Sequence, residues 1–484
     1  MSLIVLLLAP LAGAALLGRA AGPAARAVHA ATLAAILGAA VAVVIGVARD
    51  GTVTALDGLL RADALAAWMV GLIGIVATLA GAEVLGGLSA GEAEDPRRFY
   101  PLFHLFVFTM LLAVTTDDLG LMWVAVEGTT LASVFLVNFH RTRASLEAAY
   151  KYLLICSVGI ALAFVGTVFV YFADAQRLGA EAHALRWTTL LRWAPQLPAP
   201  VVQLAFVFLL VGYGTKAGLA PMHTWLPDAH SEAPAPISAL MSGVLLSVGI
   251  YAVLRFKTVV DLAAGPGFSR RLLVLFGLAS MAVAAAFLWS PTNFKRMLAY
   301  SSVEHLGLVC LGLGFGGIWG VAGAALHLGN HALAKSVLFL LSGRIRDAYG
   351  TVDIPSVRGL LTAMPVTGRG FVVALLALLG LPPFGLFISE LMIFGAGIRE
   401  GWFLAAALGL VLLLIAFGGL LRALHHMAYG SAAAGGAGVS ARETLTWKGA
   451  APMAVALSLL VLTGTAWPPG LAAALERLVA VMGG

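Results

Sequence analysis

Apolar residues gather along almost the whole chain in segments long enough to cross a lipid bilayer. A membrane-spanning helix needs about 20 consecutive apolar residues, and polar interruptions separate about fourteen such segments here. The predicted spans lie near residues 3–18, 27–48, 63–88, 102–116, 118–139, 150–172, 201–225, 237–256, 272–290, 300–321, 322–343, 367–395, 402–421 and 450–467. The loops between them are too short for an extramembrane domain. We therefore expect an all-α polytopic membrane protein.

The composition agrees with this pattern. Hydrophobic residues make up 61% of the 484-residue chain and charged residues 11%, whereas soluble domains average roughly 45–50% and about 25%. This excess of apolar residues excludes a disordered chain, and a chain with two cysteines is not a disulfide scaffold. The net charge of +6 comes with no long run of Lys and Arg and no recurring basic face, which argues against a nucleic-acid-binding protein.

The cysteines and the N-terminal segment each exclude one interpretation. Cys156 and Cys310 lie in apolar segments with no second thiol nearby, which excludes an iron–sulfur cluster or a thiolate zinc site. We expect both to be small buried side chains. A secretory signal needs a positive residue before its apolar segment. The apolar segment 1–17 has none. We therefore expect it to be retained as the first span.

The distribution of Lys and Arg predicts the orientation. With an even number of spans, both termini lie on the same side of the membrane. The loops on the opposite side hold the larger share of Lys and Arg, and such loops usually face the cytoplasm. The bias toward Ala, Gly and Arg points to a prokaryote. We therefore expect a multi-pass protein of the prokaryotic plasma membrane, with both termini on the non-cytoplasmic side.

Ionisable side chains occur inside the predicted spans, where each costs about 2.5–3.5 kcal/mol on insertion scales. Such residues are functional candidates, and here they are Glu127, Lys216, His327, His331, Lys335 and Glu390. The three in the eleventh span are spaced four residues apart, so they share one helix face. This polar stripe either carries protons or joins two helices by polar contacts. The cost of burying a lysine favours the first interpretation.

Prolines interrupt two of the spans that carry these charges. Pro221 follows Lys216 by five residues, and Pro382-Pro383 precedes Glu390 by seven. Proline removes a backbone hydrogen bond, and broken helices in membranes line polar cavities. The two broken spans, the seventh and twelfth, are an odd number of spans apart, which reverses their direction. This pattern indicates two inverted repeats with an ion site near the midplane; two unrelated kinks are the alternative.

This organisation divides the chain into four parts. Residues 1–100 would form helices 1–3, residues 101–260 the first inverted five-helix repeat (helices 4–8), and residues 270–430 the second (helices 9–13). Residues 431–484 would form helix 14. Each repeat would then contain one broken helix, and the two broken helices would have equivalent places.

Glu127 and Lys216 carry opposite charges at membrane depth, and pairing would lower the cost of burying both. A buried lysine alone loses its proton easily, whereas a nearby carboxylate holds the proton on. Movement of Glu127 would therefore control the proton on Lys216. Such a mechanism needs no cofactor.

Weaker candidates lie at the ends of spans. Those that follow the break in the seventh span could admit protons or serve only in a loop: His223, Asp228, His230 and Glu232. Glu304 and His305 begin the tenth span and could extend the central chain of protonatable groups. Glu83 and His104 lie near span ends, and we expect them at the membrane interface.

Three motifs are enough to suggest a family. These are GTKAGLAPMHTWLPDAHSEAPAPISALMSG around Lys216, NFKRMLAYSSVEHLGLV at 293–309 and HALAKSVLFLLSG at 331–343. They resemble the antiporter-like subunits of respiratory complex I, multisubunit cation/proton antiporters and membrane-bound hydrogenases, and the resemblance covers about residues 100–430. Within the family, SVEHLGLVCLGLGFGG, RDAYGTVDI and LPPFGLFISE look most like component F of hydrogenase-4 and its formate hydrogenlyase relatives.

The resemblance implies fourteen helices, two inverted five-helix repeats and a proton path along the membrane axis. By this resemblance, Glu127 matches the family's fifth-helix glutamate and Lys216 its seventh-helix lysine. Lys335, with His331 beside it, matches the proton-relay position of the eleventh helix. Glu390 matches the twelfth-helix acid or lysine that exchanges protons with the far side.

The chain departs from the family pattern in two places. Ser247 stands where many members have a lysine in the eighth helix, although hydrogenase-type members often lack that lysine too. The central path would then need water, with Ser247 or His305 bridging. We also expect the chain to lack the long lateral C-terminal helix of the largest complex I subunit.

The main hypothesis is a proton-translocating subunit of a group 4 hydrogenase or formate hydrogenlyase-like complex. The subunit itself would be non-catalytic and hold no cofactor or metal, and nickel–iron and iron–sulfur centres would belong to partner subunits. Charge displacement from those centres would push Glu127 relative to Lys216. The proton would then pass through His331 and Lys335 to Glu390.

Three alternatives stay open. The chain could be a subunit of a Na⁺/H⁺ antiporter or of complex I, because the same charges serve there. It could instead be a structural membrane anchor with a vestigial polar axis, or an energy-coupling subunit for inorganic-carbon uptake. The identity of the partners and a dependence on Na⁺ would separate these possibilities.

Overall fold

The computed structural model describes residues 1–86, 96–178, 185–430 and 447–482. These residues form α-helices almost throughout, with one small β-hairpin. The elements are α1 (Ser2–Leu17), α2 (Gly22–Asp50), β1 (Val53–Ala55), β2 (Leu60–Ala62), α3 (Ala64–Leu85), α4 (Pro96–Thr115), α5 (Leu119–Val137), α6 (Arg143–Leu178), α7 (Trp187–Trp193), η1 (Ala194–Gln196), α8 (Ala199–Ala217), η2 (Met222–Thr224), α9 (Trp225–Glu232), α10 (Ala235–Leu240), η3 (Met241–Leu245), α11 (Leu246–Ala264), α12 (Pro266–Leu288), α13 (Phe294–Phe315), α14 (Gly317–Tyr349), η4 (Ile354–Ser356), α15 (Leu360–Ala363), α16 (Pro365–Leu378), α17 (Gly385–Arg399), α18 (Phe403–Ala428), α19 (Trp447–Thr465) and α20 (Pro469–Val481).

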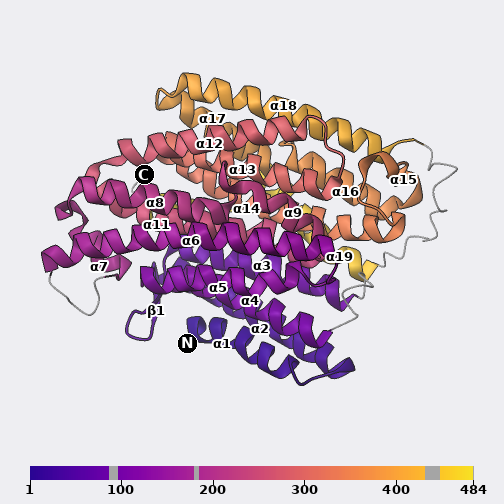
Figure 1. Cartoon of the computed structure of the whole chain (residues 1–484), viewed down its shortest axis with the longest axis horizontal. Helices are drawn as coiled ribbons and strands as arrows, with labels where there is room; N and C mark the ends of the chain where they lie inside the picture. Colours follow the sequence, from indigo (N-terminus) through magenta and orange to yellow (C-terminus); the bar gives the residue numbers. More distant parts are fainter. Residues whose placement is uncertain (87–95, 179–184, 431–446, 483–484) are drawn as a thin grey trace.

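The helices lie side by side with their axes roughly parallel (Figure 1). In the described part of the chain, 11 helices are long and apolar enough to cross a membrane, or up to 12 if α19 and α20 form one bent span. α1 and α16 are shorter apolar helices. Every predicted span overlaps one helix or consecutive helices, although the boundary predicted after residue 321 lies between α13 and α14, at Gly316. The prediction of an all-α polytopic membrane protein is therefore confirmed.

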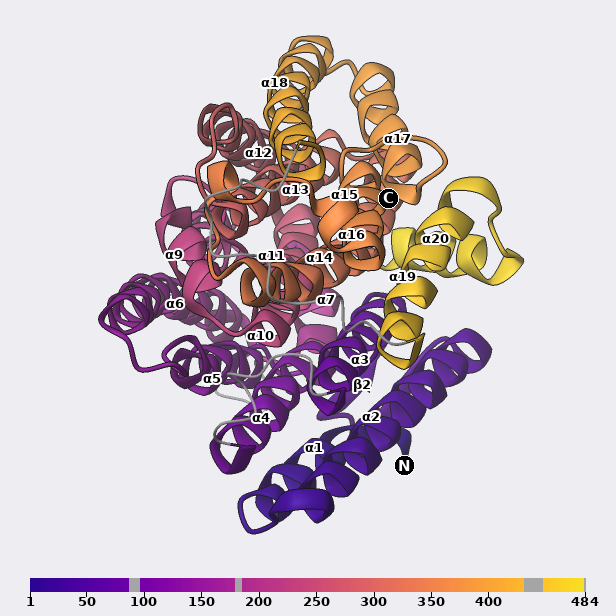
Figure 2. The same cartoon turned by 90° about the vertical axis from the view of Figure 1, so that its right-hand side faces the viewer.

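α10, α11, α13 and α14 form the centre of the bundle. In the apolar windows of α14 and of α10–α11, 100% of the residues are buried, against 28% in α18 and 39% in α2. Figure 2 shows α11 and α14 surrounded by other helices, with α1 and α2 at one edge and α18 at the opposite edge. Polar side chains on the central helices therefore face other helices and not lipid.

The two helix breaks predicted from proline are present. α8 ends at Ala217, Gly218 adopts a left-handed conformation (φ 75°), and η2 and α9 follow after Pro221. The second break separates α16 from α17 and contains Gly380 (φ 65°). Lys216 therefore lies in the last turn of α8, where the helix dipole favours a positive charge.

The eighth predicted span contains a feature that its sequence does not indicate. A π-helical segment, η3, joins α10 to α11. Within it, Ser242 Oγ lies 2.8 Å from Ser302 Oγ of α13. Gly243 packs against α14, since an added Cβ would lie 2.9 Å from Ser336 Oγ. The packing of η3 on α13 and α14 places it beside the polar residues described below. Such a position agrees with the frequent occurrence of π turns at functional sites.

Salt bridges hold both ends of α3 against the central helices. The N-cap residue Asp63 pairs with Arg255 of α11 through two contacts of 2.7 Å. Glu83 pairs with Arg344 of α14 through two contacts of 2.9 Å. Burial raises the pKa of Asp63, but the Arg255 guanidinium, together with the backbone N–H of Ala66 and the charge of Arg61, keeps that pKa below its usual value. Glu83 is therefore buried between α3 and α14, and its depth at the membrane interface stays a prediction.

Two further elements were not predicted. β1 and β2 form an antiparallel hairpin between α2 and α3. Its turn holds Leu56 and Asp57 at positive φ, followed by Gly58. α20 follows α19 and packs on α3 and α14, where Arg477 donates hydrogen bonds to carbonyl groups at the end of α2. Residues 431–446, the start of the predicted C-terminal part, lie outside the described residues.

Candidate proton path

Lys216 and Glu127 are joined through one hydroxyl group. Lys216 Nζ donates a hydrogen bond to Thr130 Oγ1 at 2.8 Å, and Thr130 Oγ1 donates one to Glu127 Oε2 at 3.2 Å. Among the described residues, no ion pair joins Lys216 to a carboxylate. The two predicted partners therefore lie in one group, but the contact between them is indirect.

α6 completes this first group. Tyr152 OH accepts a hydrogen bond from Lys216 Nζ at 2.9 Å and lies 2.7 Å from Ser133 Oγ. The Lys216 ammonium also lies 4.8 Å from the centre of the Tyr152 ring. Ser157 Oγ donates to Glu127 Oε1 at 2.9 Å. Lys216 and Tyr152 are fully buried and Glu127 is half-buried, so the carboxylate is the more accessible end of the group.

A second group joins α13, α14 and α17. His305 Nδ1 lies 2.9 Å from His327 Nε2, and His327 Nδ1 lies 2.9 Å from Ser389 Oγ. Ser389 Oγ donates its proton to Leu386 O at 2.8 Å, so its oxygen accepts from His327. We therefore assign a proton to Nδ1 of His327 and one to Nδ1 of His305. The hydrogen bonds then run in one direction, from His305 to Ser389.

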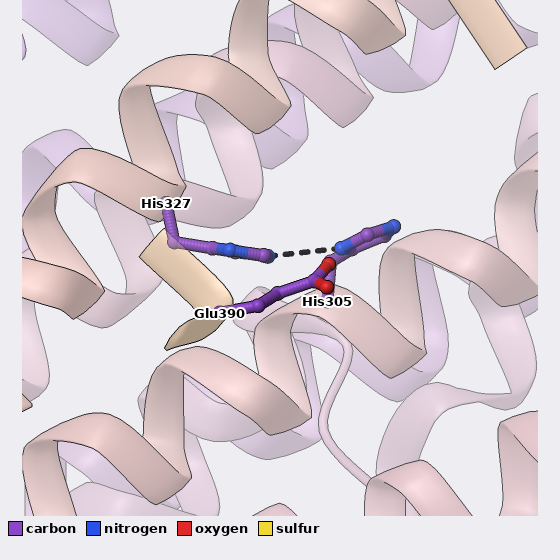
Figure 3. A group of neighbouring side chains, drawn as sticks. All are labelled: His305, His327 and Glu390. Carbon is purple, nitrogen blue, oxygen red and sulfur yellow. Dashed lines mark hydrogen bonds between the residues drawn. The ribbon is translucent and has the colours of Figure 1, made fainter. Parts of the chain in front are cut away.

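Glu390 belongs to the same group. Figure 3 shows His305, His327 and Glu390 pointing toward one another, and one ligand atom of each lies within 4.8 Å of the others. The carboxyl group is buried and its Oε1 has no hydrogen-bond partner among the described residues. It lies against the break between α16 and α17, where a Cβ on Gly380 would overlap it. The break therefore needs glycine both for its φ and for space.

The predicted polar stripe of α14 faces α13. Lys335 Nζ donates hydrogen bonds to Leu298 O and Ser301 Oγ, both at 2.5 Å. The ring of His331 lies 5.3 Å from that of His305, and neither of its nitrogens has a partner in the described part of the chain. The stripe is therefore a set of buried protonatable groups. Its contacts with α13 agree with both interpretations of the sequence, proton transfer and polar contacts between helices.

The comparisons with known proteins concern the segment that holds both groups. The family described as "NADH:quinone oxidoreductase/Mrp antiporter, TM" matches residues 116–416. The chain belongs to this family. A "Hydrogenase-4 component F homolog" of Methylacidiphilum infernorum is 40% identical over 350 residues, which are 71% of this chain and 72% of that protein. The resemblance seen in the motifs is therefore confirmed.

Chains in solved structures of two respiratory membrane complexes share the fold. A chain in the structure of the membrane-bound sulfane sulfur reductase, an archaeal respiratory membrane complex, superposes with a TM-score of 0.87, covering 99% of this chain and 97% of that chain at 23% identity. A chain of respiratory complex I from Thermus thermophilus gives a TM-score of 0.77, covering 96% and 97% at 26% identity. These similarities extend the shared fold beyond the family segment to nearly the whole chain.

Three of the weaker candidates for the proton path lie apart from the two groups. Ser247 donates a hydrogen bond to Gly243 O at 3.5 Å and lines a small apolar cavity, so no hydrogen bond among the described residues supports the predicted bridging role. Asp228 forms ion pairs with Lys151 (3.1 Å) and Arg296 (2.9 Å). His223 is buried in the break after α8, and its ring centre lies 6.2 Å from that of Tyr300.

His230 lies deeper than expected. A residue after the break in the seventh span could serve only in a loop, yet His230 is fully buried and stacks on Phe339 of α14, with 4.9 Å between ring centres. Neither ring nitrogen has a partner among the described residues. α9, which carries it, packs on both α6 and α13. His230 therefore lies on the helix that connects the first group to the second.

A buried histidine pair lies outside both groups. His29 Nδ1 of α2 lies 2.8 Å from His104 Nε2 of α4, and both side chains are fully buried. His104, which we expected at the membrane interface, is thus an interior residue. Nothing in the sequence connects these two histidines, which are 75 positions apart.

Proposed function

We propose that the chain is a proton-translocating subunit of a membrane-bound group 4 hydrogenase or formate hydrogenlyase-like complex. The observation that carries the proposal is the Lys216–Thr130–Glu127 contact, in which one hydroxyl accepts from a buried ammonium and donates to a carboxylate. Such a relay lets a change at the carboxylate alter the proton affinity of the lysine. The 40% identity to a hydrogenase-4 component F homolog supports this type of complex.

Two inverted repeats would organise the path. In this proposal α4 to α11 form the first repeat and α12 to α18 the second, with α1 to α3 before them and α19 after them. Support comes from the two breaks, which place Lys216 at the end of α8 and Glu390 near the start of α17. Breaks of this kind leave backbone carbonyl groups free to accept hydrogen bonds from water.

Water and His230 would carry the proton between the groups. Once Glu127 moves, Lys216 would release its proton toward α9, where His230 is buried without a hydrogen-bond partner among the described side chains. The proton would continue to Lys335 and His331 and then to His305 and His327. Glu390 would exchange it with the outer face of the prokaryotic plasma membrane, and the termini would lie on that outer side.

Redox chemistry would take place in partner subunits. The proposal assigns nickel–iron and iron–sulfur centres to peripheral and membrane partners and only proton movement to this subunit. Exposed apolar side chains on α18, among them Leu404, Leu408 and Leu414, give lipid or neighbouring membrane subunits a surface to cover. Reduction of a partner's centre would displace charge toward Glu127.

A second candidate is a complex I or Na⁺/H⁺ antiporter subunit. Its support is the likeness to a Thermus thermophilus complex I chain at 26% identity over 96% of this chain. Both functions use the same buried charges, so the site does not separate them. The two candidates differ in their partners.

A pull-down of tagged protein from its native membrane in mild detergent tests the proposal. Mass spectrometry should find a nickel–iron large subunit and ferredoxin-like proteins. Recovery of an NADH-oxidising arm would overturn the hydrogenase assignment in favour of complex I. Recovery of small antiporter subunits alone would move the question to Na⁺ exchange.

A further inference from the structure

We propose that His305, His327 and Glu390 form a binding site for a divalent transition-metal ion, with Zn²⁺ the best fit. The three side chains come from α13, α14 and α17 and converge on one point (Figure 3). They form the one group of three or more potential metal ligands that the described residues contain. All three are buried, so the group is built into the helix bundle.

The distances fit a three-ligand site after small movements. Zn²⁺ binds imidazole nitrogen and carboxylate oxygen at about 2.0–2.2 Å in tetrahedral geometry, which separates neighbouring ligand atoms by roughly 3.4 Å. Here His305 Nδ1 and His327 Nε2 are 2.9 Å apart, and all three ligand atoms lie within 4.8 Å. The histidines need to separate slightly, while the flexible Glu390 side chain moves inward. The fourth position stays open for water.

The hydrogen bonds around the site prepare one ligand. Because His327 donates from Nδ1 to Ser389, its Nε2 carries a lone pair, which accepts a hydrogen bond from His305 here and could bind a metal instead. A metal-binding histidine usually donates such a hydrogen bond from the ring nitrogen that does not bind the metal. Binding would move the proton of His305 from Nδ1 to Nε2 and replace that proton between the rings by the metal. Oε1 of Glu390, which has no partner among the described atoms, would gain one.

The donor set selects the ion. Two imidazoles and one carboxylate suit Zn²⁺ and its neighbours in the transition series, whereas Na⁺, Mg²⁺ and Ca²⁺ prefer oxygen ligands alone. Pro382 and Pro383, in the break beside Glu390, are exposed on the protein surface, and we expect an ion to enter from this break. If the proposed function holds, the bound ion would stop proton transfer from the histidines to Glu390.

The chain supplies a matched control in its other buried histidine pair. His29 and His104 are as close as His305 and His327, at 2.8 Å, but they belong to no group of three potential ligands in the described part of the chain. His425 and His426 lie next to each other near the surface and could bind metal weakly. Replacing these two by glutamine removes that background.

The test uses the full chain, purified with a tag that contains no histidine, in the His425→Gln/His426→Gln background. Zn²⁺ titration by calorimetry should show one site, and X-ray absorption should show two imidazoles and a carboxylate around zinc. His327→Gln and Glu390→Gln should each weaken binding at least about tenfold, and Ser389→Ala about 10–100-fold, as for other supporting residues. His104→Gln should leave the affinity unchanged.

Two results would overturn the proposal. One is an X-ray absorption spectrum that shows no histidine bound to zinc in the parent chain. This result does not depend on the folding of any variant. The other is unchanged affinity in both His327→Gln and Glu390→Gln. Both readouts are independent of proton pumping, so a failure of the proposed function would not imitate either result.

Discussion

Lys216 Nζ lies 2.8 Å from the hydroxyl oxygen of Thr130, at the point where α8 ends and the chain breaks. The same hydroxyl donates to Glu127. A hydroxyl has one proton to donate, so its orientation is fixed by the two charged groups on either side. The lysine and the glutamate are therefore coupled through a side chain that can reverse its direction when either charge changes.

Replacing Thr130 tests this coupling. Thr130→Val keeps the shape but removes the hydroxyl, and the loss of a hydrogen bond to a charged group costs about 1.5–3 kcal/mol. If that cost appears in the barrier to proton transfer, translocation in vesicles should slow about 10–100-fold. Thr130→Ser, which keeps the hydroxyl, should retain most of the rate. Equal rates in Thr130→Val and the parent chain would show that Thr130 is not a relay.

Gly380 provides a test of the position of Glu390. Gly380→Ala places a Cβ onto the Glu390 carboxyl group at a residue with φ 65°, so the carboxyl group has to move. Gly401→Ala is the matched control, because Gly401 has φ 81° but nothing within 4 Å of the added Cβ. Both variants carry a backbone cost of about 1 kcal/mol. Gly380→Ala alone should lower proton translocation.

The measurement for this pair is redox-driven acidification of vesicles at matched protein levels, followed with a pH-sensitive dye. A loss of translocation in Gly401→Ala of the same size would mean that backbone strain, and not the displaced carboxyl group, causes the effect. The position of Glu390 would then have no special role.

The salt bridge between Asp63 and Arg255 should stabilise the N-terminal helices. Both side chains are buried, and removing one partner of a buried pair costs about 3–5 kcal/mol. Arg255→Met should therefore lower the thermal unfolding midpoint of the detergent-purified protein, and Asp63→Asn/Arg255→Met should restore part of the loss. An unchanged midpoint in Arg255→Met would refute the structural role.

The same pair predicts a pH dependence. Burial raises the pKa of Asp63, but Arg255 and the smaller effects of Ala66 and Arg61 together hold it below its usual value. The stabilisation is therefore fully present above about pH 4, the pKa of an unfolded aspartate. It should be lost as the pH falls through the lower folded-state value, and Arg255→Met should lack this acid-dependent step in its unfolding midpoint.

The sequence predicts the spans and the buried charges well, for one physical reason. Burying a charge or a proline in lipid is costly, so residues such as Lys216, Lys335 and Pro221 are conspicuous in apolar segments. The helices and both breaks were predicted on this basis. The position of each charge along its helix follows directly from its residue number within the predicted span.

The partners of these charges could not be predicted, because they depend on how helices pack. Tyr152 and Ser389 look like ordinary residues of apolar helices, and only the fold places them beside Lys216 and His327. The salt bridge between Arg255 and Asp63 joins residues 192 positions apart. Thr130, three residues after Glu127, is the one partner that helical spacing could have indicated.

The most direct test of the central claim is proton translocation by a Lys216→Met variant in native membrane vesicles driven by hydrogen evolution. Lys257→Met is the control, because Lys257 is also buried but pairs with Asp261 at the far end of α11. The account predicts that Lys216→Met assembles with its partners yet loses the coupled ΔpH, while Lys257→Met keeps it. An assembled Lys216→Met complex with unchanged hydrogen evolution and unchanged ΔpH would contradict the account.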